Sequence, residues 1–457
     1  MMSARSEIAG TESQAVARSV LIGLFILFFA SGALALIYEV IWQRHFALVF
    51  GSAAPATAAL LAAYFTGLGL GSRLLGAAAA KWKHPLRAYA VLEVLIGAGA
   101  LLVTPLLHGF ETVYPWLFER FAASSSLFFL AKSFFAFVSI GIPTFCMGGT
   151  LPAVGQFVDR GQRRLGISAG LLYVANTLGA AMGALSVPFV FLPMLGARGT
   201  VWFCVSGNVF VALAAWWLDR VASASRGCVG ASSAQAGKHE GRKETARPEE
   251  THLPSLPIRP VLALSLLSGF ITFVLQVLWN RAFAQVHENS MYSFAVISAV
   301  FILALAAGAQ FARMALRRKV TPDRLIGWSW FVSGVLVALT PWLFLQLTNG
   351  LTYVPSQGGW TQYAGRLVVL AVAVLFAPVT LLGMALPILM DEAGQRRLAS
   401  PGNLLGQVLA VNVLGSVGGA ITAGFLLPQM AGLWTSIFFC GAILVFAGCW
   451  QFHSGPT

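Results

Sequence analysis

Two acidic residues stand inside long apolar stretches of the sequence. Glu39 lies near the end of the first stretch, shortly before Arg44, and Glu93 lies within the third. An isolated charge in hydrocarbon is strongly unfavourable, so such a group faces a cavity, binds a partner or takes up a proton. Both carboxylates are therefore candidate proton or cation sites. The alternatives are an interfacial pairing of Glu39 with Arg44 and a structural pairing of Glu93 with a basic residue such as Arg73.

Matching polar residues recur in the second part of the chain. Gln276 follows a Ser-Gly pair at the same spacing as Glu39 does, and Arg281 matches Arg44 in the same way. A carboxylate that faces an amide across a pseudosymmetry axis would suit a single proton or cation site. The candidates for binding a proton or a small solute are Glu39, Glu93, Gln276, Asn176, Asn412, Arg44 and Arg281.

Glycine and proline accompany these amides. Asn176 and Asn412 each precede two glycines at four-residue spacing, which lets helices approach closely while the amide hydrogen-bonds across the contact. The alternative role for Asn176 and Asn412 is a polar contact in a cavity or gate. Two Pro/Gly-rich segments, 147–152 and 382–387, should kink or interrupt their helices, and paired interruptions mark binding sites in transporters, although they also simply end helices. The packing or hinge positions are Gly148, Gly149, Pro152, Gly179, Gly183, Gly383, Pro387, Gly415 and Gly419.

Several kinds of chemistry have no motif in this sequence. No Gly-rich loop ends in Gly-Lys-Ser/Thr, the seven histidines lack metal-ligand spacing, and the five cysteines form no Cys-x-x-Cys pair. No Ser-His-Asp order stands out. We therefore expect no catalytic residues, no metal and no cofactor.

The composition excludes an ordinary soluble domain. Of 457 residues, 58% are hydrophobic and only 10% are charged, against about 25% charged in soluble proteins. The mean hydropathy is +0.78. The net charge of +13 comes from basic residues in short loops, which favours an effect on membrane orientation over nucleic-acid binding.

Apolar stretches predict an all-α polytopic membrane protein with about twelve transmembrane helices. They cover residues 20–38, 55–78, 88–107, 127–151, 167–194, 200–218, 260–279, 291–315, 325–347, 365–390, 403–428 and 432–450. The segment at 220–258 is polar and almost free of large apolar residues, which predicts a flexible cytoplasmic linker. Residues 1–219 and 259–457 then form two membrane halves.

The two halves repeat one another in order. Besides the Ser-Gly pairs, Pro85 matches Pro322, the segment 147–152 matches 382–387, and Asn176 matches Asn412. Each half holds an even number of helices, so both enter the membrane in the same direction and form parallel six-helix repeats, as in major facilitator transporters. Loops after even-numbered helices carry most of the Lys and Arg, which predicts cytoplasmic termini.

Several motifs resemble the membrane region of bacterial fused major facilitator and spermidine synthase proteins. They are Ser31-Gly32, residues 37–44, Phe50-Gly51-Ser52, residues 67–72, residues 147–152 and residues 176–183. The resemblance implies a bacterial inner-membrane protein. Longer members carry a soluble aminopropyltransferase-like domain with a Gly-rich turn; the sequence has no such turn, so no catalytic residue is transferred and enzymatic activity is not favoured.

The sequence leads to two functional hypotheses. The first is a secondary transporter of a small polar solute, with a polyamine or related cation suggested by the carboxylates and the resemblance. The second is a membrane scaffold that holds, or feeds substrate to, a separately encoded spermidine synthase-like enzyme.

Overall fold

The computed structural model of the chain describes residues 2–50, 53–79, 81–121, 125–161, 169–235, 258–287, 291–318, 320–352, 360–394 and 401–454. These residues are helical apart from short turns and connections. An α-helix satisfies every backbone hydrogen bond within its own segment, which is what lets such apolar stretches lie in lipid.

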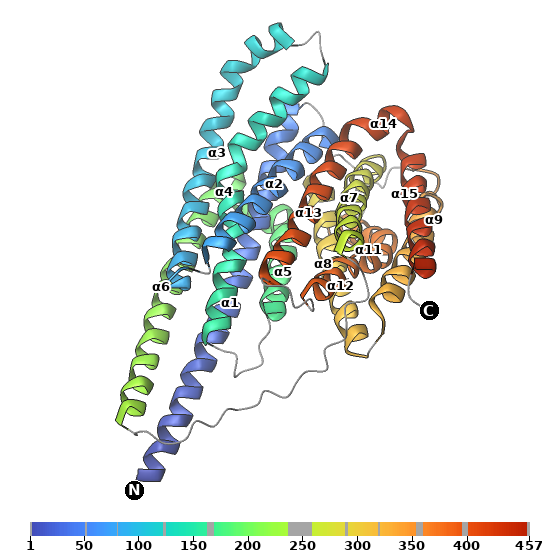
Figure 1. Cartoon of the computed structure of the whole chain (residues 1–457). Coiled ribbons are helices and arrows are strands. Elements are labelled where there is room, and N and C mark those ends of the chain that lie inside the picture. Colours follow the sequence, from blue (N-terminus) through green and yellow to red (C-terminus); the bar gives the residue numbers. More distant parts are fainter. Residues whose placement is uncertain are drawn as a thin grey trace.

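The first half is built from long helices (Figure 1). They are α1 (Met2–Phe50), α2 (Ala53–Ala79), α3 (Pro85–Phe121), α4 (Ser125–Gly161), α5 (Ala169–Ser186), the π-helical segment η2 (Val187–Phe191) and α6 (Leu192–Gln235). The α3–α4 hairpin projects beyond its neighbours at the end opposite the N-terminus (Figure 1).

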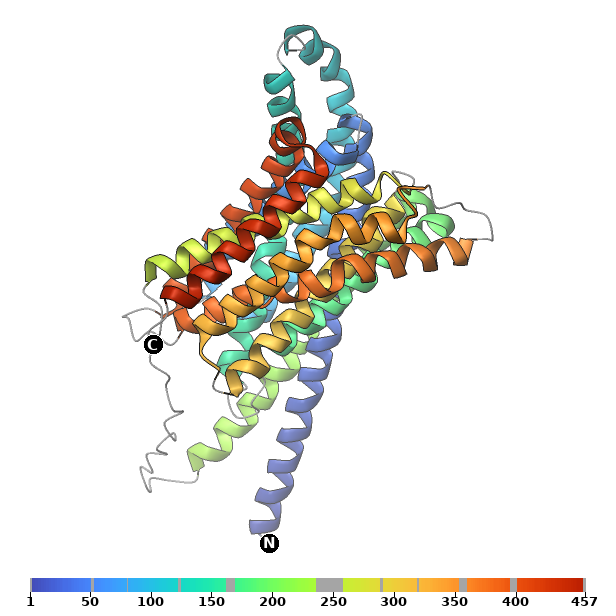
Figure 2. The same cartoon turned by 90° about the vertical axis from the view of Figure 1, so that its right-hand side faces the viewer.

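The second half contains shorter and more interrupted helices, which are tilted against α1 and α6 (Figure 2). They are α7 (Ile258–Phe283), α8 (Met291–Arg317), α9 (Pro322–Leu347), α10 (Trp360–Ala371), η3 (Val372–Phe376), α11 (Ala377–Leu382), α12 (Ala385–Gly394), α13 (Pro401–Ile421), η4 (Thr422–Leu426), α14 (Leu427–Met430) and α15 (Leu433–Ser454).

The described residues contain 11 segments long and apolar enough to cross a membrane. One of them, Val174–Ala224, has 51 residues, about 75 Å of helix at 1.5 Å per residue, against a hydrocarbon core of about 30 Å. Gly196 breaks this segment with φ 65° and ψ 178°, a conformation that glycine adopts without steric cost. The segment is therefore long enough for two crossings, which gives twelve candidate crossings among the described residues, the number that the sequence predicted.

The two halves have one hydrophobic core each, and α2 and α8 contribute residues to both cores. The first core includes Phe294, Ala295 and Ala299 of α8, while the second includes Ala58 and Leu61 of α2. Thus α2 packs against α7 and α13, and α8 packs against α1 and α5. The halves meet through these two helices, which occupy equivalent places in the repeat.

The glycines expected to mediate packing lie at close helix crossings. A Cβ at Gly179 or Gly183 of α5 would overlap the carbonyl oxygen of Phe29 or Ala33 on α1. In the second half, a Cβ at Gly415 or Gly419 of α13 would overlap a carbonyl oxygen of α7 in the same way, at Leu266 and Phe270. The repeat seen in the sequence is therefore a repeat of backbone contacts.

The two Pro/Gly-rich segments behave differently from each other. In the second half, the helix is interrupted at Gly383 and Met384, between α11 and α12. The segment containing Gly148, Gly149 and Pro152 lies in α4, which continues without interruption. Gly148 instead allows close packing, because a Cβ there would overlap the carbonyl oxygen of Leu68 on α2. The expected interruption is thus present in one half and absent from the other.

The boundary expected for the polar linker also needs correction. Helix α6 continues to Gln235, so the chain is still helical beyond position 220, where we expected the linker to begin. The remainder of that segment, residues 236–257, lies outside the described residues.

Candidate functional site

Glu93 lies at the centre of a hydrogen-bonded cluster inside the first half. Its carboxylate is fully buried. One oxygen accepts a hydrogen bond of 2.6 Å from the Ser31 hydroxyl on α1, and the other accepts one of 2.7 Å from the Asn208 amide on α6. The Tyr38 hydroxyl donates to the same Asn208 side chain at 2.8 Å. The cluster therefore joins α1, α3 and α6.

The two hydrogen bonds stabilise the buried carboxylate of Glu93 without a basic partner. Two donors directed at a carboxylate satisfy it as an acceptor, and such hydrogen bonds are stronger than neutral ones. The pairing with Arg73 considered from the sequence does not occur among the described ion pairs. In the second half the equivalent position is Trp330, which is fully buried, so the cluster belongs to one half only.

Glu39 is also buried, but its surroundings differ. It is 5% exposed, and among the described residues its carboxylate has no ion pair and no hydrogen bond. Arg44, the partner considered from the sequence, is exposed. The hydroxyl of Tyr64 on α2 lies within electrostatic reach of the carboxylate. A buried carboxylate without such a partner faces a cavity, binds a cation or takes up a proton.

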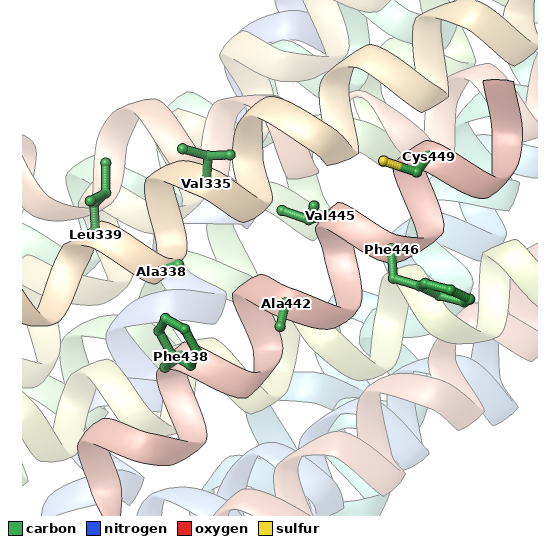
Figure 3. Close-up of a pocket in the computed structure, with 8 residues that line it drawn as sticks. All are labelled: Val335, Ala338, Leu339, Phe438, Ala442, Val445, Phe446 and Cys449. Atoms are coloured by element: carbon green, nitrogen blue, oxygen red, sulfur yellow. The ribbon is translucent and has the colours of Figure 1, made fainter.

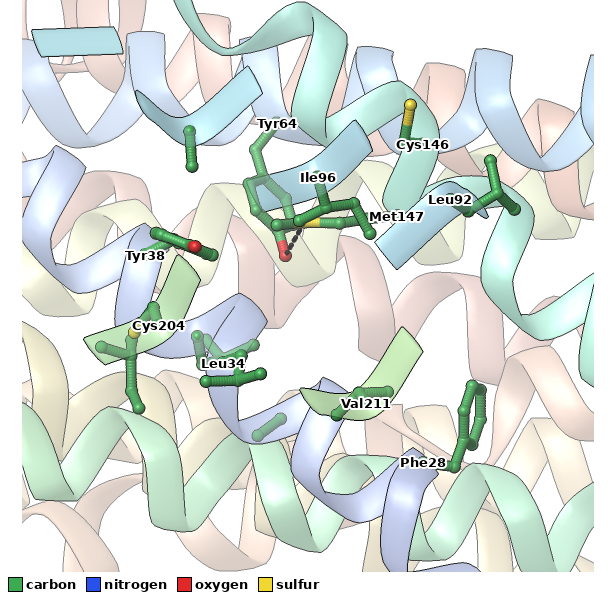
Figure 4. Packing of buried hydrophobic residues seen from close by; sticks show 14 of the residues in the cluster. Phe28, Leu34, Tyr38, Tyr64, Leu92, Ile96, Cys146, Met147, Cys204 and Val211 are labelled. Atoms are coloured by element: carbon green, nitrogen blue, oxygen red, sulfur yellow. Dashed lines mark hydrogen bonds between the residues drawn. The ribbon is translucent and has the colours of Figure 1, made fainter. Parts of the chain in front are cut away.

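Tyr64 connects Glu39 to α4. Its hydroxyl donates a hydrogen bond of 3.6 Å to the Met147 sulfur, drawn as a dashed line in Figure 4. Met147 begins the Pro/Gly-rich segment of α4. The acidic residue, the tyrosine and the thioether thus come from α1, α2 and α4, and Gly148 supports the contact by letting α4 approach α2.

Phe65, the next residue of α2, contacts the second half. The ring of Phe65 packs edge-on against Phe273 of α7, with centroids 4.3 Å apart, and it also contacts Tyr64 at 5.6 Å. Gln276 lies three residues after Phe273, close to one helical turn, on the same side of α7. The Phe65–Phe273 contact therefore joins the two halves, next to Tyr64 on α2 and about one turn from Gln276 on α7.

Gln276 resembles Glu39 in burial as well as in repeat position. It is 5% exposed, and its side-chain amide makes no hydrogen bond among the residues described. Asn176 and Asn412 differ, because their amides donate to carbonyl oxygens of Phe28 at 3.1 Å and Ser265 at 2.9 Å. These two amides stabilise the α1–α5 and α7–α13 crossings.

Arg281 and His287 lie near the end of α7 that leads to α8. Arg281 is partly buried, and its Nη1 atom has no hydrogen-bond partner within the described chain. His287 follows the membrane-spanning part of α7 and contacts Phe283 and Tyr363 through its ring. Burial lowers the pKa of His287 to about 4. No group of three or more His, Cys, Asp or Glu residues in the described part could hold a metal ion.

Two apolar grooves lie away from these polar residues. One runs between α9 and α15 and is lined by Val335, Leu339, Phe438 and Val445, among others (Figure 3). The other lies between α3 and α4. Exposed apolar side chains are normal on the lipid-facing surface of a membrane protein, and neither groove contains a candidate polar residue.

Sequence reasoning identified Glu39 and Gln276 but missed the aromatic residues beside them. Tyr64, Phe65 and Phe273 are ordinary members of apolar stretches, and only the pairing of α2 with α7 brings them together. Tyr38 and Asn208 were missed for the same reason. Asn208 carried a usable signal, since an amide inside an apolar helix requires a partner.

Comparison with known proteins identifies the fold. No protein-family model matches the chain, and no curated protein matches it. Similar solved structures include a POT family transporter in complex with a thioalcohol-conjugated peptide, with a TM-score of 0.60, 12% identity, and coverage of 95% of this chain and 96% of that one. The nucleoside transporter NupG gives a TM-score of 0.58 at 14% identity, covering 95% of this chain and 100% of that one.

The proton:xylose symporter XylE, a major facilitator superfamily protein bound to 6-bromo-6-deoxy-D-glucose, gives a TM-score of 0.51 at 16% identity, with coverage of 96% of each chain. At such low identity these similarities concern the fold. The chain is a multi-pass membrane protein with a major-facilitator-like fold, made of two parallel six-helix halves.

Proposed function

We propose that this protein is a secondary transporter of a small polar solute, with Glu39 as its proton- or cation-binding group. The observation that carries the proposal is the pair of repeat-equivalent residues Glu39 and Gln276. Both are buried, and neither side chain has a hydrogen-bond or ion-pair partner among the described residues.

The fold supports this proposal through the way its halves meet. In major facilitator transporters, two halves rock against one another around a site on their shared axis. Here α2 and α8 each contribute residues to the opposite core, so movement of the halves would shift α2, whose Tyr64 lies within electrostatic reach of Glu39. A bound cation or proton would supply the positive charge that the carboxylate lacks.

The carboxylate favours a cationic solute, of which a polyamine is one example. No POT peptide, nucleoside or sugar is implied for this chain by the similarity of fold. The basic loops support an orientation with both termini in the cytoplasm, and the resemblance of the motifs to bacterial proteins supports an inner-membrane location. Labelling of single cysteines placed in the loops, with a reagent that cannot cross the membrane, tests this orientation.

Uptake by proteoliposomes tests the transport function. The purified full chain is reconstituted and supplied with labelled putrescine, spermidine and a panel of amino acids, with and without an imposed proton gradient. Saturable uptake that responds to the gradient and depends on Glu39 supports the proposal. Absence of uptake by folded, correctly inserted protein contradicts it.

A scaffold for a soluble transferase-like enzyme is a second candidate. One observation favours it: α1 and α6 project from the same end of the molecule in both views (Figures 1 and 2), because α1 begins well before its membrane-spanning part at Ser19 and α6 continues beyond Ala224. Co-purification from gently solubilised membranes would recover a stoichiometric soluble enzyme if this role is correct. Recovery of the chain without such a partner contradicts it.

A further inference from the structure

Two segments that begin with a π-helical turn occupy equivalent places in the two halves, and we propose that they form a paired gate between the halves. The first hinge segment, residues 187–196, follows α5, and the second, residues 422–432, follows α13. Both follow odd-numbered crossings, which run in the same direction as α1, and α14 of the second segment lies at the end opposite the N-terminus (Figure 1). This inference rests on the proposed transport function and names the parts that open and close this end.

The two hinge segments match one another in sequence position and in backbone conformation. Counting from the repeat pair Gly183 and Gly419, Gly196 falls on Gly432. Both Gly196 and Gly432 have positive φ, 65° and 74°. The π-helical turns η2 and η4 lie within one residue of equivalent positions, and a proline follows each turn at the same spacing. The fold therefore contains the same interrupted segment twice.

Each hinge segment packs against the helix of the opposite half that contributes to both cores. Phe189 of η2 contacts Tyr292 of α8, with ring centroids 6.0 Å apart, and it also packs against the second core. Gly424 of η4 lies so close to Ala58 of α2 that a Cβ at Gly424 would overlap the Cβ of Ala58. The third π-helical turn, η3, has no such counterpart, because the corresponding residues of α4 are α-helical. The repeated π turns are thus the two that join the halves.

A segment bounded in this way can bend at both of its ends. A π turn is a local departure from the α-helix that is common at functional sites and at helix kinks. At the other end, Gly196 and Gly432 adopt a left-handed conformation that glycine tolerates and other residues do not. A Cβ at either position would meet nothing within 4 Å, so backbone conformation alone favours glycine there. Bending at these points would move η2 away from α8 and η4 away from α2.

Distance measurements between two spin labels test the gate without any solute. In a background without the native cysteines, labels are attached at Met194→Cys and Met430→Cys, one in each hinge segment, where the native side chains are 76% and 80% exposed. Pulsed dipolar spectroscopy of the full chain in lipid nanodiscs should show two distance populations, because opening separates segments that belong to different halves. A single distance population in this protein and in both alanine variants described next overturns the inference.

Gly196→Ala and Gly432→Ala, each made in the labelled protein, test the hinges themselves. Alanine opposes the positive φ of the closed segment, so each variant should shift the ratio of the populations by about fivefold or more towards the longer distance. If one variant fails to show a cooperative melting transition, the other carries the test. A ratio unchanged in every folded variant of the two means that the glycines do not change conformation on opening, and it overturns the inference.

Gly350→Ala is the matched control. Gly350 also has a positive φ of 74°, and a Cβ there would likewise meet nothing within 4 Å. It lies between α9 and α10, outside both hinge segments, so Gly350→Ala should leave the ratio of the populations unchanged. A shift as large as that of Gly196→Ala or Gly432→Ala would show that strain at any left-handed glycine has this effect, and it would overturn the inference.

Uptake separates this inference from the transport function itself. Two distance populations that respond to Gly196→Ala or Gly432→Ala, without uptake of any solute by correctly inserted protein, overturn transport and leave the paired movement intact. Saturable uptake by protein that shows a single distance population, with and without the alanine substitutions, overturns the gate and leaves transport intact.

Discussion

Glu39 on α1 and Glu93 on α3 are both buried, but their surroundings differ. Glu93 accepts hydrogen bonds of 2.6 and 2.7 Å from α1 and α6, so its environment holds it in place. Glu39 has no such donors among the described residues. Environments that differ in this way separate a structural acid from a titrating one.

The two glutamates should therefore respond differently to neutralisation. Glu39→Gln should abolish the dependence of uptake on the proton gradient with little loss of thermal stability, since no described contact is removed. Glu93→Gln replaces an acceptor with an amide donor that faces the Asn208 amide, and it should destabilise the protein by about 1–3 kcal/mol. Melting curves and gradient-driven uptake of both variants check this; a reversed pattern would contradict it.

His287 gives a pH dependence outside the membrane-spanning segments. Burial holds its pKa at about 4, below the unfolded value of about 6.5, so the folded protein binds fewer protons than the unfolded chain between these values. Its contribution to stability is complete above about pH 6.5 and is lost as the pH falls toward 4. His287→Phe should reduce the fall in melting temperature over this range. Parallel curves for both proteins would argue against this.

The sequence predicted the candidate acids because charge in an apolar stretch is conspicuous, but it did not distinguish them. The distinction depends on which helix each side chain faces. Ser31 and Asn208 reach Glu93 only because α6 packs against both α1 and α3. Such contacts between distant segments leave no trace in the spacing of residues along one helix.

At the scale of helices, the repeated glycines set how closely the elements approach. A Cβ at Gly415 would overlap the Leu266 carbonyl oxygen, which belongs to the backbone and cannot move aside. The repeat is imperfect in one respect. Helix α4 is continuous, whereas its counterpart in the second half is interrupted at Gly383 and Met384. The equivalent proline and glycine positions therefore did not suffice to predict equivalent helix breaks.

Replacing one close-packed glycine with alanine should separate two helices. Gly415→Ala is expected to destabilise the protein by about 1–3 kcal/mol through overpacking against α7. Gly155→Ala on α4 is the matched control, because a Cβ there meets nothing within 4 Å and alanine favours helix. Thermal melting of the two variants compares them directly. Equal stability of Gly415→Ala and the wild-type protein would show that the crossing is looser than described.

At the scale of the molecule, the parallel repeat was enough to predict two six-helix halves and a major-facilitator-like fold. It could not predict that α2 and α8 contribute residues to both cores, because contacts between halves join residues that are unrelated by the repeat. Phe65 and Phe273 are an example: their apolar character fits any buried position, and only the docked halves make them neighbours.

A cross-link between the halves should prevent the rocking movement. Phe189 of η2 and Tyr292 of α8 face one another with ring centroids 6.0 Å apart. In a background without the native cysteines, Phe189→Cys with Tyr292→Cys and a short bifunctional thiol reagent should stop uptake, and a cleavable reagent should allow its recovery on reduction. Each single cysteine variant is the control. Full uptake by the cross-linked protein would contradict movement at this contact.

The central claim is that Glu39 couples solute movement to a proton or cation gradient. The most direct measurement is uptake by proteoliposomes containing the wild-type chain or Glu39→Gln, with the proton gradient imposed or absent. We predict saturable, gradient-dependent uptake by the wild-type protein and loss of the gradient dependence in Glu39→Gln. Uptake with an unchanged gradient dependence in Glu39→Gln would contradict the claim.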